Sequence, residues 1–293
     1  METAGPYERP TVVVASSVDP VASRVADRWG TPPATGGSVE GTPIRQLAPS
    51  VFLLKRPGPH IHDERLDRRL PPTLREQRPT LVFPSIHRSE QGLPCLTVHP
   101  LGNLGPSAEV GGQPRTVVPT DPARMVATLR SLSEDGAAHG LAATFEATHH
   151  GPELGLPAYF VEIGFGDRSE PPPEAVELLA EVIARIEPEG HDRVAVGIGG
   201  GHYAPHFTDL ALRRRWSFGH IVSRHALESL DDATARAVYA ATPGAEGLLY
   251  ARSADQAVPS LRGLAPRRKD SDAPPRERGD VGISRAGSPA SGT

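Results

Sequence analysis

The chain has 293 residues, 38% of them hydrophobic, and a formal net charge of -4 at pH 7, which argues against indiscriminate nucleic-acid binding because such binding is driven by cationic side chains. Its single cysteine, Cys95, excludes an intrachain disulfide and any zinc site made of several cysteines. We expect a cytoplasmic protein without a membrane segment, because no apolar run is long enough to span a bilayer and residues 1–10 do not resemble a signal peptide.

Composition varies along the chain and divides it into parts. Residues 30–43 and 253–293 are rich in Gly, Pro, Ser, Ala and charge, a composition that cannot offset its ordering entropy. We therefore predict a loop over residues 30–43 and a disordered tail, rich in Pro, Arg and Ser, over residues 253–293. Residues 1–10 are expected to form a flexible extension, so that one folded domain spans residues 11–252.

The first half of the chain alternates short apolar runs with helix signals. A buried strand over residues 12–15 precedes a helix that begins after Asp19 and extends to about residue 29, because Asp19 is an N-cap residue and a proline follows it. The same aspartate-proline signal at Asp121 begins a second amphipathic helix, which ends near Gly136. Further strands are predicted over residues 51–55, 81–83, 96–98 and 141–148.

The second half continues this alternation. Consecutive prolines open the helix with the widest apolar face, over residues 173–186, and another helix is predicted over residues 232–241. Strands are predicted over residues 159–164, 193–198, 218–222 and 248–250. Alternation without internal repeats favours an α/β fold, a layered single domain with a mixed, mainly parallel central sheet flanked by helices.

A glycine-rich run at residues 197–201 follows the strand predicted over residues 193–198 and leads into His202 and Tyr203. Glycine permits positive φ and close approach of a ligand, and successive backbone N–H groups can form an anion-binding concavity. The run lacks the ending of a P-loop and the spacing of a dinucleotide fingerprint, so no nucleotide cofactor is expected. The structural alternative, glycines that let a helix pack closely on the sheet, is weaker for consecutive glycines that end in a histidine.

A second predicted strand end carries acid/base and metal-binding side chains. Period-two alternation places Glu146, Thr148 and His150 on one face of the strand. His149 then lies on the opposite face, so that one histidine binds while the other packs or orients it. Glu162 lies within an aliphatic run, where a carboxylate is either buried with a partner or functional. Because ligands of open α/β sheets sit beyond the carboxyl ends of the strands, we expect one shared site.

Imidazole and carboxylate are the zinc ligands that remain when thiolates are absent, and a catalytic zinc keeps one position open. The histidine spacing does not match the compact helical H-E-x-x-H pattern, so a metal site here must be assembled from separate strands. A single histidine at a strand end is more often a hydrogen-bonded structural residue, but the convergence of several favours a site. The candidate ligands are His149, His150, His202 and His220, with His87 and His99 as weaker candidates.

Long, irregular motifs carry a family resemblance. They are Glu146–Pro152, Phe160–Gly164, Gly197–Pro205 followed by Phe207-Thr208, Phe218–Ile221, and Leu96–Pro100 followed by Gly102-Asn103. The chain resembles, across most of residues 12–222, the archaeal and plant type of D-aminoacyl-tRNA deacylase. The resemblance implies a zinc-dependent hydrolase with a fold similar to those of peptidyl-tRNA hydrolases and phosphorylases. The chain departs from the family pattern at Ile86, Phe165 and His206, where the family usually carries arginine, a small polar residue and arginine.

The resemblance also implies roles for residues of this chain. The reaction would be hydrolysis of the ester bond of D-aminoacyl-tRNA, with Zn2+ as cofactor, by a monomer or small homo-oligomer. Glu146, Glu162 and His202 would be catalytic, as metal ligand, partner of a ligand or general base. The residues expected to bind the substrate or its oxyanion are Gly199, Gly200, Gly201, Tyr203 and Thr148.

Three consecutive arginines, Arg213, Arg214 and Arg215, are predicted to contact the tRNA backbone, with a solvated helix face as the alternative. Two other functions remain open at this point. One keeps the metal and the fold but changes the substrate, which gives a zinc-dependent peptidase or amidohydrolase. The other is a catalytically silent tRNA-binding module, which need not retain a metal.

Overall fold

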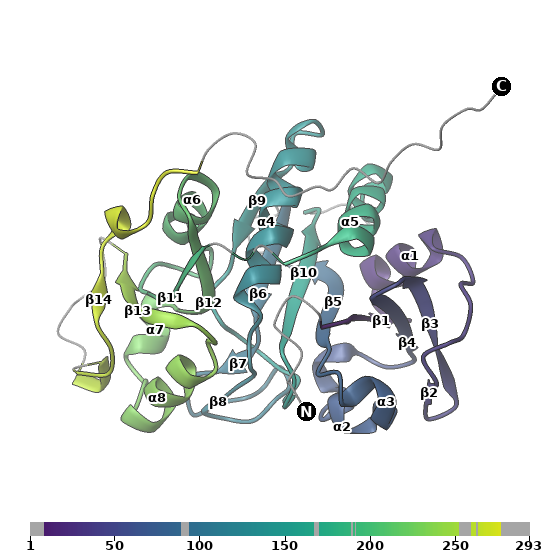
Figure 1. The fold of residues 1–293 in the computed structure, drawn as a ribbon, viewed down its shortest axis with the longest axis horizontal. Helices are drawn as coiled ribbons and strands as arrows, with labels where there is room; N and C mark the ends of the chain where they lie inside the picture. Colours follow the sequence, from purple (N-terminus) through teal and green to yellow (C-terminus); the bar gives the residue numbers. More distant parts are fainter. Residues whose placement is uncertain are drawn as a thin grey trace.

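The computed structural model describes residues 9–88, 94–166, 170–188, 190, 192–251, 259–261 and 263–276. Its centre is an eight-stranded sheet (Figure 1) made of β1 (Thr11–Ser16), β2 (Ser38–Val39), β3 (Thr42–Ala48), β4 (Val51–Arg56), β5 (Thr80–His87), β6 (Cys95–Pro100), β9 (Ala142–Phe145) and β10 (Ala158–Gly164). The strand order is β2-β3-β4-β1-β5-β10-β6-β9. Strands β4, β1, β5 and β10 are parallel, whereas β6 pairs antiparallel with β10. The predicted α/β fold with a mixed, mainly parallel central sheet is confirmed.

The later strands form a second sheet beside the first. It consists of β11 (Arg193–Ile198), β12 (Trp216–Val222), β13 (Ala245–Tyr250) and β14 (Arg267–Arg268), in the order β12-β11-β13-β14 and parallel throughout. A small antiparallel pair, β7 (Gly102–Asn103) and β8 (Thr116–Val117), completes the strands of the described residues. The strand pattern alone did not indicate this division into sheets.

The helices begin where the sequence places caps. Asp19 accepts hydrogen bonds from the backbone amides of Val21 and Ala22, and Asp121 accepts one from that of Arg124. The longer helices are α1 (Pro20–Arg28), α4 (Pro122–Ala137), α5 (Pro173–Arg185), α6 (Pro205–Arg213) and α8 (Asp232–Ala240). Within the described ranges, none of the helices combines the length and apolarity that crossing a membrane requires.

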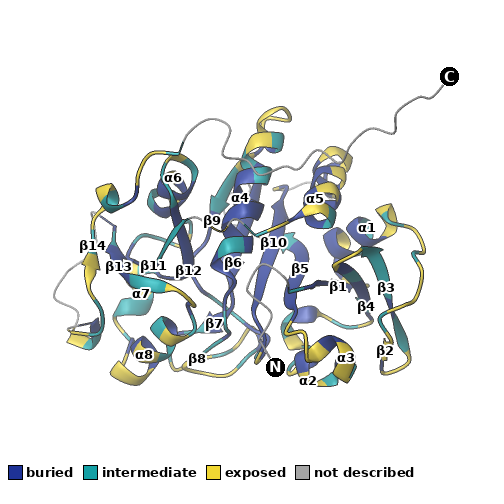
Figure 2. Cartoon of the chain, in the orientation of Figure 1, coloured by how far each residue is buried: buried dark blue, intermediate teal, exposed yellow. Residues whose placement is uncertain are grey.

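The two faces of the central sheet are covered differently. Helices α1, α4 and α5 pack on one face, with Val13, Val82 and Val161 at its centre. The other face carries Phe83 and Phe160 and is covered by short elements, namely η1 (His60–His62), α2 (Leu66–Arg69) and α3 (Pro72–Arg75). Figure 2 shows the central strands buried and the outer surfaces of the helices exposed. The thinly covered face is the one that carries the candidate site.

The loop predicted over residues 30–43 is in part a hairpin. Strands β2 and β3 pair antiparallel, with Ser38 opposite Pro43 and Val39 opposite Thr42. Between them, Glu40 and Gly41 both have positive φ, at 50° and 82°, as a two-residue hairpin turn requires. The prediction of a loop is therefore wrong for the second half of this segment, because composition alone did not register a turn between such short strands.

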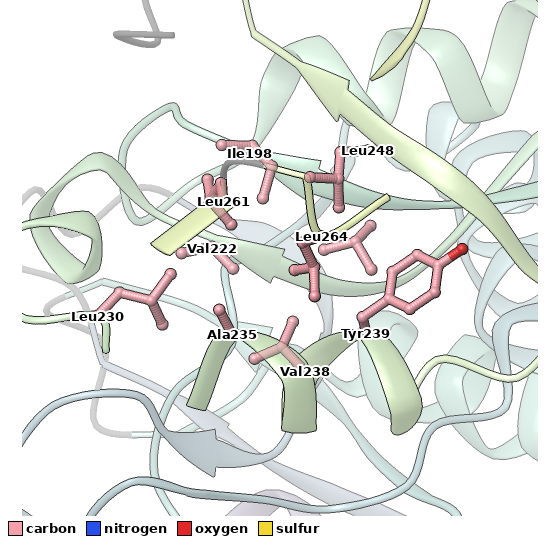
Figure 3. A pocket seen from close by; sticks show the side chains of 10 residues that line it. Ile198, Val222, Leu230, Ala235, Val238, Tyr239, Leu248, Leu261 and Leu264 are labelled. Carbon is pink, nitrogen blue, oxygen red and sulfur yellow. The ribbon is translucent and has the colours of Figure 1, made fainter. Parts of the chain in front are cut away.

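The fold also extends past residue 252, where the sequence placed a disordered tail. Leu261 and Leu264 pack against β11, β12, β13 and α8, in an apolar cluster drawn in Figure 3. Strand β14 pairs with β13, and Ala273 is fully buried. The predicted boundary is therefore wrong for the described residues 259–261 and 263–276. The average composition of residues 253–293 is polar, and it did not reveal the few apolar side chains that pack against the domain.

The ends of the chain are only partly described. Residues 1–8 of the predicted extension and residues 253–258, 262 and 277–293 of the predicted tail lie outside the described residues. At the start of the described part, the carbonyl of Pro10 accepts a hydrogen bond of 2.9 Å from the amide of Thr80, and Pro10 is buried. The predicted flexible extension over residues 1–10 is thus wrong at its last position, where the chain already enters the sheet.

Candidate active site

Three neighbouring strands present polar side chains on the thinly covered face of the central sheet. In the β-sheet register, Phe160 of β10 lies opposite His99 of β6, and Glu162 lies opposite Ser85 of β5. Directly paired residues point to the same side, and so do residues two apart, which places His87 at the end of β5 on this face as well. The site therefore lies on this face near the carboxyl ends of the parallel strands β5 and β10, as the sequence predicted, and the antiparallel strand β6 adds His99 from the opposite direction.

The segment after β9 covers this face. Strand β9 ends at Phe145, and backbone bonds then join the amide of Glu146 to the carbonyl of Val98 at 3.0 Å and the amide of Ala147 to the carbonyl of His202 at 2.8 Å. Strict alternation does not continue past Phe145. Glu146 therefore lies beside His149 and not beside Thr148, which corrects the predicted assignment of faces.

Glu146 is fully buried in the site, as His99 is, with 0% of its side chain exposed. Its Oε2 lies 3.0 Å from Nε2 of His202 and 3.6 Å from Nε2 of His149, and its Oε1 lies 3.1 Å from Nδ1 of His87. Neither oxygen receives a well-directed hydrogen bond from a described residue. Burial favours the neutral acid, but the imidazoles of His202 and His87 hold the pKa of Glu146 well below its usual range.

His87 links the two carboxylates of the site. Its Nδ1 donates to Oε2 of Glu162 at 3.2 Å, and its Nε2 lies 2.8 Å from the hydroxyl of Tyr203. Burial opposes the charged imidazole, but Glu146 and Glu162 raise the pKa of His87 to about 11. Burial also opposes the Glu162 carboxylate, but His87 and His99 lower its pKa to about 2. The site thus holds two carboxylates at neutral pH, and the His87 cation lies between them.

The imidazoles of His99, His149 and His150 share one arrangement. Each Nδ1 faces a backbone carbonyl, that of Pro100 at 3.2 Å, of Ala147 at 2.8 Å and of Gly151 at 2.8 Å, respectively. A carbonyl oxygen only accepts, so each Nδ1 donates, and a ring in its neutral form keeps a lone pair on Nε2. Burial opposes the charged form of His99, but the Glu162 carboxylate raises its pKa, so a metal ion would have to displace a proton there. Nε2 of His99 is buried without a hydrogen-bond partner. This arrangement fixes the tautomer that binds a metal ion.

These side chains also meet the distance condition for a metal site. One candidate ligand atom from each of His99, His149 and His150 lies within 4.8 Å of the others, and the same holds for two groups that contain Glu146, namely His87-Glu146-His202 and His99-Glu146-Glu162. Burial, followed by the charge of His99, lowers the pKa of His150 to about 4 and that of His149 well below its usual range, which favours their neutral, metal-binding forms. Nitrogen and carboxylate donors suit zinc.

His220 does not join this cluster. Its Nε2 donates to the carbonyl of Val118 at 3.0 Å, and its Nδ1 accepts from the hydroxyl of Thr148 at 3.0 Å. The same hydroxyl accepts from the amide of Ile221 at 3.1 Å. Both ring nitrogens of His220 and the Thr148 hydroxyl are thus engaged in the interior between the sheets. We therefore remove His220 from the predicted ligands and Thr148 from the predicted oxyanion donors.

The glycine run serves mainly to direct the chain. Gly199 and Gly200 have φ values of 96° and 88°, conformations that favour glycine. The amide of Gly199 donates to the carbonyl of Val222 at 2.7 Å, so it is not available to an oxyanion, which corrects that part of the prediction. The turn carries the chain from β11 to His202 and Tyr203, which do join the site. An anion-binding role for Gly200 and Gly201 stays a prediction.

The arginine run separates into one exposed side chain and two anchoring ones. The side chain of Arg213 is 79% exposed and pairs with Asp209 of the same helix. Arg214 donates to the carbonyl of Ala273 at 3.3 Å, and Nε of Arg215 lies 3.7 Å from a carboxylate oxygen of Asp192. Arg214 and Arg215 therefore contribute to tertiary packing, and contact of Arg213 with tRNA stays a prediction.

A pocket of about 500 Å³ opens beside the cluster. Its polar lining includes His87, His149, His150, Glu162 and His202, which the sequence predicted, and also Ser16, Asp19, His60 and Ser85, which it did not. Oδ2 of Asp19 accepts from the Ser85 hydroxyl at 2.9 Å and from the Ile86 amide at 3.1 Å, so the N-cap of α1 also fixes the end of β5. Only the folded chain brings these segments together.

Comparison with known proteins connects these residues to a family. A family model described as D-aminoacyl-tRNA deacylase matches residues 74–259, a range that contains His87, Glu146 and His202. A curated protein named D-aminoacyl-tRNA deacylase from Thermoplasma acidophilum is 38% identical over 172 residues, which cover 59% of this chain and 67% of the relative. Its namesake from Pyrococcus horikoshii is 36% identical over 193 residues, covering 64% and 69%.

One further relative is much longer than the matched region, and one solved structure shares the fold. A D-aminoacyl-tRNA deacylase from Methanoregula boonei is 44% identical over 153 residues, but these cover only 34% of that protein. The matched region thus spans about two thirds of the length of the first relatives and about one third of the length of the Methanoregula boonei protein. A crystal structure of a conserved protein of unknown function superposes with a TM-score of 0.75 at 26% identity, covering 88% of this chain and 90% of the other.

Proposed function

Because the chain belongs to the D-aminoacyl-tRNA deacylase family, we propose that it hydrolyses the ester bond of D-aminoacyl-tRNA and releases free D-amino acid and tRNA, in the cytoplasm where tRNA is used. One observation of the structure carries this proposal. The Glu146 carboxylate is fully buried and lies 3.0 Å from His202 and 3.1 Å from His87, but neither oxygen receives a well-directed hydrogen bond, and the neighbouring His149 and His150 turn Nδ1 to backbone carbonyls. Such unmet bonding capacity is costly in an interior unless a ligand or a reaction uses it.

The site fits a metal ion, and zinc suits its donors best. His99, His149 and His150 would hold the ion through Nε2, with Glu146 or Glu162 as the carboxylate ligand. When bound, such an ion polarises the ester carbonyl and lowers the pKa of water. The hydrogen bonds from Nδ1 to backbone carbonyls orient these rings before any ion arrives.

His202 is placed to move the proton that hydrolysis requires. Its side chain is 49% exposed, lines the pocket and brings Nε2 to 3.0 Å from Glu146. His202 would take a proton from the attacking water, and Glu146 would stabilise the imidazolium that forms. The proton would then pass to the ribose oxygen as the ester bond breaks. His87 and Tyr203 would keep Glu162 and Glu146 ionised and in position.

The proposal is tested with purified protein and radiolabelled D- and L-aminoacyl-tRNA, each followed for loss of the ester bond with and without a chelator. We expect chelator-sensitive hydrolysis of the D-form only. The variant His202→Asn should lose this activity, whereas His225→Asn, a change at an exposed histidine outside the pocket, should keep it. Absence of D-specific hydrolysis would refute the function, and hydrolysis by protein shown by elemental analysis to lack metal would refute the role of the ion.

A further inference from the structure

The lining of the pocket beside the cluster combines apolar residues with polar ones, among them Arg88. We call its apolar members the apolar wall, and they are Val18, Pro20, Pro59, Ile61, Ile86 and Val110. Val18 is 61% exposed and Val110 is 49% exposed, and they are the exposed large hydrophobic residues of the described chain. Both border the same pocket, so the hydrophobic surface that the fold leaves uncovered is gathered beside the candidate site.

The loop that carries Val110 is held in place by its backbone. Gly111 and Gly112 have φ values of 74° and 77°, and a Cβ atom at Gly111 would lie 1.7 Å from the carbonyl oxygen of Ile61. The side chain of Asn103 donates to the carbonyl of Gly111 at 2.8 Å, and a carboxylate oxygen of Glu64 accepts from the amide of Gly112 at 2.6 Å. The apolar wall is therefore preformed, which lowers the entropic cost of binding.

His60 adds a polar group to the same pocket. It is 3% exposed and packs against the rings of Phe83 and Phe160, and its Nε2 donates to the carbonyl of Pro84 at 2.9 Å. That bond leaves Nδ1 as a hydrogen-bond acceptor, for which the described residues supply no donor. The pocket thus combines apolar surface with a buried histidine whose ring is held in a fixed position.

These features suit a ligand group that is the same in every substrate. An aminoacyl-tRNA has two groups next to its ester, the amino-acid side chain, which varies, and the terminal adenosine, which does not. Rigid apolar surface and a fixed acceptor fit a flat base with apolar faces and an amino edge. We propose, on the basis of the proposed function, that this pocket binds the adenine of the terminal nucleotide, with its ring against the apolar wall and its exocyclic amine donating to Nδ1 of His60.

The proposal assigns the two halves of the substrate to different surroundings. Adenine against the apolar wall would place the attached ribose and its ester toward His149, His150 and His202, which border the same pocket. A volume of about 500 Å³ lies within the range of pockets that enclose small organic ligands. Activity would then depend strongly on the terminal base and weakly on the identity of the D-amino acid.

The test measures binding of free nucleosides to the full chain by calorimetry, a readout that does not depend on catalysis. The probes are adenosine, purine riboside, which lacks the exocyclic amine, and cytidine. We expect adenosine to bind about tenfold more tightly than cytidine and about fivefold more tightly than purine riboside, the effect of one lost hydrogen bond. Equal binding of adenosine and cytidine would overturn the proposal.

Two variants locate the binding. His60→Gln retains a donor for the carbonyl of Pro84 but has no acceptor at the position of Nδ1, since its amide oxygen lies elsewhere, so adenosine and purine riboside should bind it equally. Val18→Ser alters an exposed side chain that does not threaten the fold, and it should weaken adenosine binding about fivefold. His225→Gln is the matched control and should bind like the unmodified chain. The proposal would be overturned if His60→Gln still bound adenosine more tightly than purine riboside and Val18→Ser bound adenosine as tightly as the unmodified chain.

Hydrolysis of D-aminoacyl-tRNA, measured on the same preparations, separates the two proposals. Hydrolysis without selective adenosine binding would leave the proposed function standing and overturn the assignment of the pocket. Selective adenosine binding that responds to His60→Gln, without hydrolysis, would support the pocket and refute the function.

Discussion

Two buried clusters of charged side chains differ in whether their polar atoms form well-directed hydrogen bonds. In the first, the guanidinium of Arg130 donates to Asp192 at 2.6 Å and to the carbonyl of Ala211 at 2.9 Å, with side chains only 3% and 4% exposed. In the second, the carboxylate of Glu146 is equally buried but receives no well-directed hydrogen bond from a described residue. Only the second borders the 500 Å³ pocket, through His149 and His202.

This difference teaches that a buried charge does not by itself mark a functional site. Arg130 and Asp192 satisfy each other and tie α4 to the segments around β11 and α6, which is a structural task. The site around Glu146 combines burial, unmet bonding capacity and an adjacent pocket. Substitutions in the first cluster should therefore change stability, whereas substitutions in the second should change chemistry.

The largest effect is expected from Glu146→Gln. This change keeps the shape but removes the charge that would stabilise a protonated His202 and contribute to metal binding, so kcat for D-aminoacyl-tRNA should fall about 10³-fold. The free energy of unfolding should also decrease, because His202 and His87 hold the pKa of Glu146 well below its usual range, so its charge stabilises the folded chain at neutral pH. Steady-state kinetics and denaturant titration measure the two quantities. An unchanged kcat would show that Glu146 is merely structural.

The converse change, Arg130→Met, should act on stability alone. Removing the guanidinium leaves the buried Asp192 with only the longer contacts to Arg215 at 3.7 Å and to the Ser217 hydroxyl at 3.4 Å, which should cost about 3 kcal/mol of unfolding free energy. The kcat per folded molecule should stay the same. Combining Arg130→Met with Asp192→Leu should recover part of the loss, because the unpaired charge is then gone. A large fall in kcat of the folded variant would break the distinction between the clusters.

A pH-dependent effect of similar size is expected from His220, the histidine that lies outside the site. Burial lowers its pKa to about 4 in the folded chain, below the ordinary value of about 6.5. Between pH 4 and pH 6.5, His220 is protonated in the unfolded chain but neutral in the folded chain. Acid therefore favours the unfolded chain: the contribution of His220 to the free energy of unfolding is fully present above pH 6.5 and is lost as pH falls toward 4. The difference amounts to about 3 kcal/mol.

Unfolding measured between pH 4 and pH 7 in the unmodified chain and in His220→Gln tests this expectation. The variant should lose less stability on acidification, because its side chain does not titrate and still offers a donor to the carbonyl of Val118. His225→Gln, at an exposed position, should follow the unmodified chain. If the free energy of unfolding fell equally with pH in the unmodified chain and in His220→Gln, the acid sensitivity could not be assigned to His220.

The smallest effect is expected from Tyr203→Phe. The phenol hydroxyl lies 2.8 Å from Nε2 of His87, which in turn contacts both carboxylates, so its loss loosens the site without removing any proposed ligand. The kcat should fall about tenfold, the effect of one hydrogen bond to a charged group, while metal content stays unchanged. Loss of the metal in this variant would show that Tyr203 supports binding of the ion and not only the position of His87.

The sequence alone predicted most elements of the fold and most residues of the site. Caps such as Asp19 and Asp121, and apolar runs such as residues 193–198, are local signals that persist in the folded chain. The family followed from long motifs around Glu146 and His202, and the family model and relatives confirm it. These features depend on neighbouring residues, which the sequence displays directly.

Tertiary structure decided which of these residues act together. It removed His220 from the candidate ligands and favoured His99, which the sequence had given as a weaker candidate. Pairing of β6 with β10 brings His99 to Glu162, while His220 bonds to Val118 and Thr148. It also brought His60 and Val110 to one pocket from distant parts of the chain. Strand order and the direction of β6 are set by hydrogen bonds between segments far apart in sequence, and no local pattern encodes them.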